Sequence, residues 1–255
     1  MAMMLYVIVA FALCSFFPAI EGAFDNARLP PQSVHAFMYL WYGVPGEYDE
    51  TYLHWDHEVL PHWESHVNAQ YPEVGTRFTP PEGLHSPYYP LYGPYSSRDQ
   101  AVLFRQFDEM VNSGIDVAVL SWWGQKDKPY ATDTQGVNTD SLMEQVLTTA
   151  DKHGKIQIAF HLEPYPGRKV ESVKEDIPYI YEQYGHHSCL LRTFDNKPLL
   201  VFYVYDSYHI HANYWNRLLH VEGDMTIRGS AYDAFMIGEY RVPYPPSLFH
   251  AIRRY

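Results

Sequence analysis

Short apolar runs alternate with amphipathic segments along most of this chain of 255 residues. The apolar runs predict buried strands at residues 36–43, 116–124, 155–165, 199–206 and 234–238. Between these runs, apolar residues recur at about helical spacing, which predicts helices at residues 97–112, 140–153, 171–184 and 214–221. Strands and helices therefore alternate, and this order predicts an α/β fold with a parallel sheet and right-handed crossovers.

Polar and aromatic clusters follow the predicted strands and read WYG, SWWG, HLEPY and YVYDSY. In an α/β barrel the carboxyl ends of the strands form the active-site face, so we expect these clusters to converge there. A doubly wound sheet would also place functional residues at its strand ends. However, the chain has neither a G-x-G-x-x-G nor a Walker A sequence, so nothing supports nucleotide binding. The long segment 44–96, rich in Pro, His, Tyr and Trp, is predicted to be a functional loop.

Composition and charge exclude two classes of protein. Aromatic residues make up 16% of the chain, which is far from the composition of a disordered protein. The formal net charge of −12 argues against a nucleic-acid partner, because an acidic surface repels the phosphate backbone. The two cysteines are Cys14 and Cys189, and Cys14 lies in the leader described next. We therefore expect no disulfide within the mature chain.

The N-terminal stretch 5–20 is apolar and carries no charged residue. As a helix it would span about 24 Å, which is short of the ~30 Å hydrocarbon core of a bilayer. Residues 1–22 are therefore predicted to be a secretory signal peptide, with a short signal anchor as the alternative. Either interpretation places the rest of the chain in the secretory pathway.

Carboxylates and aromatic rings dominate the candidate chemistry. Glu163 ends the third predicted strand and Asp206 ends the fourth, and a pair of carboxylates is what glycoside hydrolysis requires. Many aromatic side chains lie at strand ends or in the long loop, where they could stack on sugar rings or simply form core. These are Trp41, Tyr42, Trp55, Trp63, Trp122, Trp123, Tyr165, Tyr205 and Tyr208.

The long loop also holds four histidines, namely His54, His57, His62 and His66. No Cys and no H-E-x-x-H motif joins them, so we interpret them as structural or sugar-contacting residues. We expect no metal and no cofactor. Cys189, which stands outside the strand-end clusters, is interpreted as structural rather than nucleophilic.

Several long stretches resemble the glycoprotein endo-α-1,2-mannosidase family, glycoside hydrolase family 99. They include AFMYLWYG, YLHWDHEVLPHW, PYYPLYGPYSSRD, SGIDVAVLSWWG, AFHLEPYPGR, DIPYIYEQYG, LLVFYVYDSY and TIRGSAYDAFMIG. The resemblance implies a (β/α)8 TIM barrel and a glycosidase that cleaves inside α-mannoside chains with retention. It also implies release of a glucosylated mannose oligosaccharide from N-glycans in the Golgi, so the expected partner is a mannose-containing oligosaccharide.

The same resemblance implies a set of substrate-binding residues in this chain. They are Tyr42, Asp49, Trp123, His161, Glu163, Asp206 and Tyr208. The family's two catalytic carboxylates lie in an E-W-x-E motif, and no such motif occurs in these 255 residues. We therefore assign no catalytic residue from the sequence.

The resemblance covers only part of a barrel. It assigns residues 35–238 to about five of eight βα units and residues 239–255 to an unrelated tail. An open barrel leaves strand edges unpaired, which predicts self-association through those edges. Three interpretations remain open: an endo-α-1,2-mannosidase of doubtful activity, a non-catalytic secreted carbohydrate-binding relative, or a truncated splice or gene-model product without function.

Overall fold

The computed structural model describes Val7–Ile8, Leu29, residues 33–62, 64–194 and 196–240, and Ile252–Arg253. The strands are β1 Val7–Ile8, β2 His35–Met38, β3 Val117–Trp122, β4 Gln157–Leu162, β5 Leu200–Val204, β6 Ala234–Tyr240 and β7 Ile252–Arg253. The helices are α1 Ser65–Asn68, α2 Gln100–Asn112, α3 Asp140–His153, α4 Val170–Tyr184 and α5 Ala212–Leu219, with a 3₁₀ turn at Ser207–His209. No described helix is long and apolar enough to cross a bilayer.

Strands β2 to β6 lie side by side in chain order, and each pairs parallel with the next. The register aligns Ser121 with His161 and His161 with Tyr203 across three neighbouring strands. This uninterrupted order is that of a (β/α)8-type barrel, since a doubly wound sheet reverses its strand order near the middle. The predicted parallel α/β sheet and its barrel type are confirmed, with five parallel strands of the barrel among the described residues.

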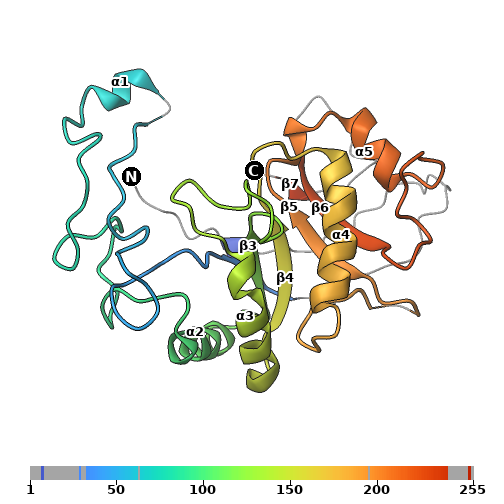
Figure 1. The fold of residues 1–255 in the computed structure, drawn as a ribbon, viewed down its shortest axis with the longest axis horizontal. Helices are drawn as coiled ribbons and strands as arrows, with labels where there is room; N and C mark the ends of the chain where they lie inside the picture. Colours follow the sequence, from blue (N-terminus) through green and yellow to red (C-terminus); the bar gives the residue numbers. More distant parts are fainter. Residues whose placement is uncertain are drawn as a thin grey trace.

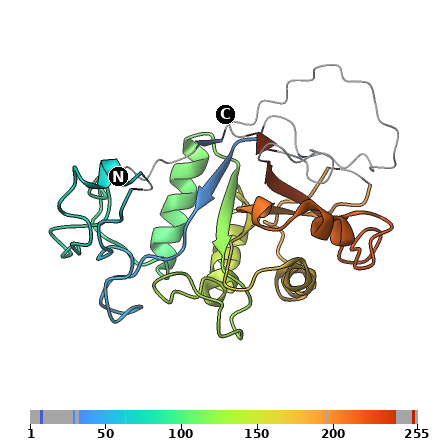
Figure 2. The same cartoon turned by 90° about the horizontal axis from the view of Figure 1, so that it is seen from above.

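All the long helices cover one face of the sheet, and α3 and α4 stand in front of β3 to β5 in Figure 1. Figure 2 gives the same arrangement from above. On this outer face, Leu120 and Phe160 of the strands pack with Phe107 of α2 and Leu147 of α3, all within 2% exposure. Because side chains alternate along a strand, Val119 and Val201 point to the opposite face. That opposite face is called the inner face below.

The predicted elements agree closely with the observed ones. Helix α3 has the predicted bounds 140–153, and α4 runs through Pro178 as far as Tyr184. The first strand is shorter than predicted because it ends at Met38, and the next residues bend towards the long loop. Strand β6 is longer than predicted and includes Glu239 and Tyr240.

The long loop 44–96 is packed rather than loose, although its only described helix is the single turn α1. It lies at the opposite end of the molecule from α5 (Figure 1). Trp55 is 2% exposed, and its Nε1 donates to the carbonyl oxygen of Tyr95 at 2.9 Å. At the start of the loop, Gly43 pairs with Leu53, and a Cβ on Gly43 would come within 2.8 Å of the Leu53 side chain. A glycine is therefore required where the loop folds back on itself.

The domain limits at residues 22 and 238 and the proposed leader stay predictions. Apart from β1, which pairs antiparallel with β2, the leader lies outside the described residues. The same holds for residues 241–251, whereas β7 pairs with the end of β6. Self-association through the sheet edges also stays a prediction.

Candidate active site

A buried cluster of Ser121, His161 and Glu163 lies on the inner face at the carboxyl edge of the sheet. Ser121 of β3 and His161 of β4 stand opposite each other in the register, and Glu163 follows β4 directly. The Ser121 hydroxyl donates to Glu163 Oε1 at 2.8 Å, and His161 Nδ1 lies 3.2 Å from the same oxygen. Glu163 is 3% exposed and His161 4%. Such burial of a carboxylate is costly unless it is paired or hydrogen-bonded, so the position serves more than packing.

Three buried nitrogens near these strand ends have no hydrogen-bond partner among the described residues. They are His161 Nδ1, which lies off the hydrogen-bonding angle to Glu163, and the indole Nε1 atoms of Trp41 and Trp123. A buried polar atom left unpaired costs on the order of 1–3 kcal/mol, so folded proteins rarely keep several of them. A ligand hydroxyl group that reached one of these nitrogens would satisfy it.

Aromatic rings form a stacked column beside this cluster. Tyr39 stacks on Trp41 at 4.3 Å between ring centroids, and Trp41 stacks on His54 at 4.4 Å. His54 Nε2 in turn lies 2.7 Å from Asp133 Oδ2, which ties the long loop to the segment after β3. Burial, with the nearby charge of Glu163, raises the pKa of Tyr39, so its hydroxyl stays a hydrogen-bond donor at neutral pH.

Arg168 joins the ends of β4 and β5. Its guanidinium donates to the carbonyl oxygens of Leu162 at 2.9 Å and Asp206 at 3.0 Å. Burial lowers the pKa of Arg168, whereas the nearby carboxylates of Glu163, Asp206 and Glu239 raise it. The carboxylates that follow or end β4, β5 and β6 therefore all act on one partly buried cation.

The remaining expected residues make different kinds of contact. Asp206 adopts a left-handed backbone with φ of 48°, and the Tyr208 hydroxyl donates to its carboxylate. Tyr42 stacks on Trp55 at 4.1 Å, and burial raises the pKa of its hydroxyl. Asp49 accepts from the Val44 amide at 3.3 Å.

Asp49 also lies 3.5 Å from Arg98 Nε, with 5% of its side chain exposed. Of the expected residues, His161 and Glu163 meet directly, and Asp206 approaches them through Arg168. Trp123 follows β3, and its backbone amide donates to Thr139 Oγ1 at 3.3 Å. Tyr42 and Asp49 pack within the start of the long loop.

The sequence analysis missed Ser121, Arg168 and Glu239. Ser121 is a polar residue inside the buried strand β3, which is a signal that could have found it. Glu239 is a charged residue near the end of a strand, as Glu163 is, but it was assigned to the tail. Arg168 lies in the quoted stretch AFHLEPYPGR, yet only the fold brings it to Asp206.

The model of Glycosyl hydrolase family 99 matches residues 31–242, most of the chain. This chain belongs to glycoside hydrolase family 99. The Glycoprotein endo-alpha-1,2-mannosidase-like protein of Danio rerio is 40% identical over 206 residues, which cover 80% of this chain and 45% of that protein. The Glycoprotein endo-alpha-1,2-mannosidase of Mus musculus is 37% identical over 224 residues, which cover 86% of this chain and 47% of that protein.

A solved family 99 structure, the endo-alpha-mannosidase from Bacteroides thetaiotaomicron, aligns with a TM-score of 0.65 at 29% identity. The alignment covers 81% of this chain and 55% of that one. The chain therefore spans about half the length of the relatives it matches. The predicted family is confirmed, and the family match extends to the end of β6.

The other singled-out residues have structural contacts in the described part of the chain. His57 Nδ1 lies 3.0 Å from the carbonyl oxygen of Glu58, and His62 Nδ1 accepts from the Glu64 amide at 3.0 Å. His66 Nε2 lies 3.4 Å from Glu64 Oε2. Cys189 is buried, and burial raises the pKa of its thiol, as expected for a structural cysteine. Trp63 lies outside the described residues.

Proposed function

We propose that the protein is a glycoside hydrolase of the endo-α-1,2-mannosidase type, acting on internal α-mannosidic linkages of glucosylated N-glycans. We further propose that this chain forms the substrate-binding wall of the cleft. The observation that carries the proposal is the buried cluster of Ser121, His161 and Glu163 at the carboxyl edge of a family 99 barrel. In barrel enzymes, this edge is where substrates bind.

The chemistry of the cluster suits a neutral polyhydroxylated ligand. Glu163 can accept hydrogen bonds from sugar hydroxyls, and the unpaired nitrogens of His161, Trp41 and Trp123 can satisfy their oxygens. The indole of Trp123 offers apolar surface to the C–H face of a sugar ring, whereas the faces of Trp41 are covered by Tyr39 and His54. An anionic ligand would meet the carboxylates of Glu163, Asp206 and Glu239 near Arg168 and would be repelled.

We assign binding roles to Tyr42, Asp49, Trp123, His161, Glu163, Asp206 and Tyr208, and we add Ser121 and Arg168. Bond cleavage is assigned to no residue of this chain, because the carboxylates implied by the family resemblance belong to an E-W-x-E motif that its sequence lacks. A second function, carbohydrate binding without cleavage, is favoured by the same observation. Both functions require that the cluster bind α-mannosides.

Binding and cleavage can be tested separately on the purified full chain. Calorimetry with α-1,2-mannobiose and with a glucosylated oligomannose measures affinity, and mass spectrometry of the mixture detects released oligosaccharide. Glu163→Gln and Trp123→Ala should each weaken binding by about 1–3 kcal/mol, because each removes a hydrogen bond or a stacking surface. Glu73→Gln, at an exposed glutamate of the long loop, is the matched control and should bind as the wild type does.

Each outcome has a defined meaning. Release of oligosaccharide by the wild type supports the hydrolase, and binding without release supports the carbohydrate-binding protein. No binding by a folded wild-type chain, or unchanged affinity in both variants, contradicts the site.

The proposed location is the secretory pathway, as a Golgi lumenal or membrane-anchored protein or as a secreted one. The support is the uncharged apolar stretch 5–20 at the N-terminus. N-terminal sequencing of the protein recovered from a secreting cell line distinguishes a cleaved leader from a retained anchor.

A further inference from the structure

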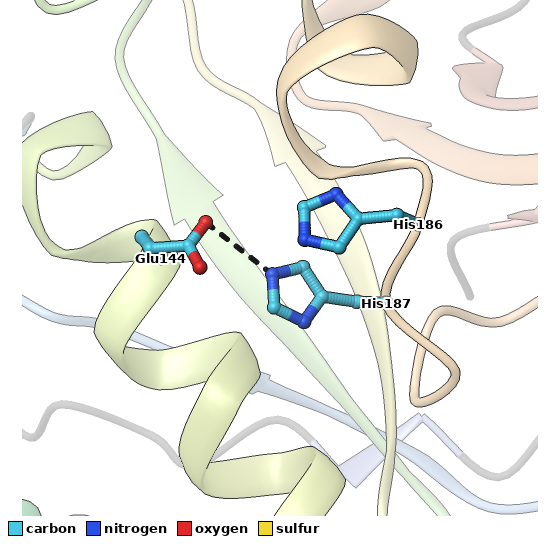
Figure 3. A group of neighbouring side chains, drawn as sticks. All are labelled: Glu144, His186 and His187. Atoms are coloured by element: carbon cyan, nitrogen blue, oxygen red, sulfur yellow. Dashed lines mark hydrogen bonds and ion pairs between the residues drawn. The ribbon is translucent and has the colours of Figure 1, made fainter.

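A second group of ligating side chains lies on the outer, helix-covered face, away from the inner-face cluster. Glu144 comes from α3, and His186 and His187 come from the segment just after α4. One ligand atom of each lies within 4.8 Å of the others, and no other such group of three occurs among the described residues. Figure 3 shows both imidazole rings extending towards Glu144.

We propose that Glu144, His186 and His187 bind a divalent late first-row transition-metal ion, with Zn²⁺ as the representative. The sequence analysis expects no metal, so this proposal departs from that expectation. Two imidazoles and a carboxylate with an open fourth position form a recurring Zn²⁺ ligand set. Mg²⁺ and Ca²⁺ prefer oxygen ligands and fit this group poorly.

The hydrogen bond of His187 to Asp151 prepares its ring for a metal. His187 Nδ1 lies 2.6 Å from Asp151 Oδ2. The other oxygen of Asp151 accepts from the Ser188 hydroxyl at 2.8 Å and from the Cys189 amide at 2.7 Å. A carboxylate oxygen accepts, so His187 Nδ1 is the donor in this pair, and Nε2 lies on the side of the ring that faces Glu144. A carboxylate that orients a ligating histidine in this way is the usual outer-shell partner of a metal-bound imidazole.

His187 Nε2 lies 3.4 Å from Glu144 Oε2. About 3.3 Å is the separation of two ligands on a tetrahedral Zn²⁺ with bonds of about 2 Å, so this pair already has the spacing of two ligands. His186 supplies a further imidazole, with its ring centroid 4.2 Å from that of His187.

Only a small movement of two exposed side chains is needed to bring the three ligand atoms to bonding distance of one ion. His186 and Glu144 are both exposed, so their side chains can rotate inwards by about 1 Å without disturbing the core. His187 is 5% exposed and stays fixed by Asp151. A bound ion would join α3 to the segment that leads from α4 into β5.

The test is calorimetric titration of the full chain, freed of any polyhistidine tag, with Zn²⁺ and then with Mg²⁺ or Ca²⁺. The wild type should bind one equivalent of Zn²⁺ and neither of the other ions. His186→Ala and Glu144→Gln should each weaken Zn²⁺ binding by at least the roughly 10–100-fold that loss of an outer-shell partner costs. Both residues are exposed, so the variants should fold as the wild type does.

His66→Ala is the matched control. His66 Nε2 lies 3.4 Å from Glu64 Oε2, the same distance as in the His187–Glu144 pair, but both side chains are more than half exposed. The control should retain the wild-type affinity. The proposal is overturned if the wild type binds no Zn²⁺, if either His186→Ala or Glu144→Gln keeps wild-type affinity, or if His66→Ala loses as much. Co²⁺ provides a second readout, since visible absorption bands of four-coordinate Co²⁺ should appear in the wild type and disappear in His186→Ala.

Discussion

Two histidines of this protein are equally buried next to carboxylates, yet their surroundings differ. His161 on the inner face and His187 on the outer face each have 5% of the side chain exposed. Both nitrogens of His187 face carboxylates, at 2.6 Å and 3.4 Å. His161 Nδ1 lies 3.2 Å from Glu163 at an angle that makes no hydrogen bond. The outer histidine is oriented by its neighbours, whereas the inner one is left with unused hydrogen-bonding capacity.

This difference follows from where each residue lies in the fold. His161 is part of β4, so its direction is set by the strand and it cannot turn to optimise a contact. His187 follows the end of α4, where the chain is free to adapt to α3. The neighbours of His187 therefore contribute to stability, whereas His161 keeps a nitrogen that a ligand can reach. Three experiments test this difference between the two faces, from the largest expected effect to the smallest.

The largest expected effect belongs to Asp140, the first residue of α3. Its carboxylate accepts from Trp122 Nε1 at 2.6 Å and from the hydroxyls of Tyr179 at 2.7 Å and Tyr184 at 2.9 Å. Asp140→Ala should lower the free energy of unfolding by about 3 kcal/mol or more, because each buried donor left unpaired costs on the order of 1–3 kcal/mol. Urea unfolding followed by circular dichroism measures the loss.

Glu109→Ala is the control for Asp140→Ala. Glu109 lies 3.9 Å from Arg105 Nε and both side chains are exposed, so its loss should change stability by less than about 1 kcal/mol. Equal losses in the two variants would show that the polar network around Asp140 does not stabilise the helix layer.

A pH effect is expected from Asp176 of α4, which accepts hydrogen bonds from Gln125 and Tyr165. Burial raises the pKa of this carboxyl to about 6, against hydrogen bonds from Tyr165 and Gln125 that lower it. Between about pH 4 and pH 6 the folded state keeps a proton that the unfolded state, with a pKa of 3.8, has released. Stability should therefore fall by roughly 2–3 kcal/mol as the pH rises through this window and should then level off.

Asp176→Asn should remove that slope, because the amide does not titrate and can still bond Tyr165. Thermal melting of both proteins from pH 4 to pH 7 makes the comparison. A wild-type profile that matches the Asp176→Asn profile would refute the assignment.

The smallest expected effect is the most direct test of the contrast between the histidines. His187→Leu should lower the free energy of unfolding by about 1–3 kcal/mol, because Asp151 loses a hydrogen bond. His161→Leu should change stability by less than about 1 kcal/mol, because it removes a ring that makes no hydrogen bond through Nδ1 and keeps a similar volume. His161→Leu should nevertheless weaken binding of α-mannosides. Denaturant unfolding with calorimetry on both variants measures the two effects, and a larger stability loss in His161→Leu would reverse the comparison.

The element order, the parallel sheet and the family could all be predicted from the sequence alone. These depend on local hydrophobic periodicity and on long matching stretches, and the bounds of α3 were predicted without error. The sequence also identified Glu163 from its place at the end of a buried strand, and His161 through the family resemblance.

Which distant residues are in contact could be learned only from the tertiary structure. Ser121 reaches Glu163 across 42 residues, and Arg168 reaches Asp206 across 38, through strand register and loop packing that no local pattern encodes. The pairing of His187 with Glu144, 43 residues apart, arises in the same way from the packing of α3 beside the end of α4. Contacts between neighbouring elements depend on three-dimensional packing, whereas the elements themselves depend on the period of their own side chains.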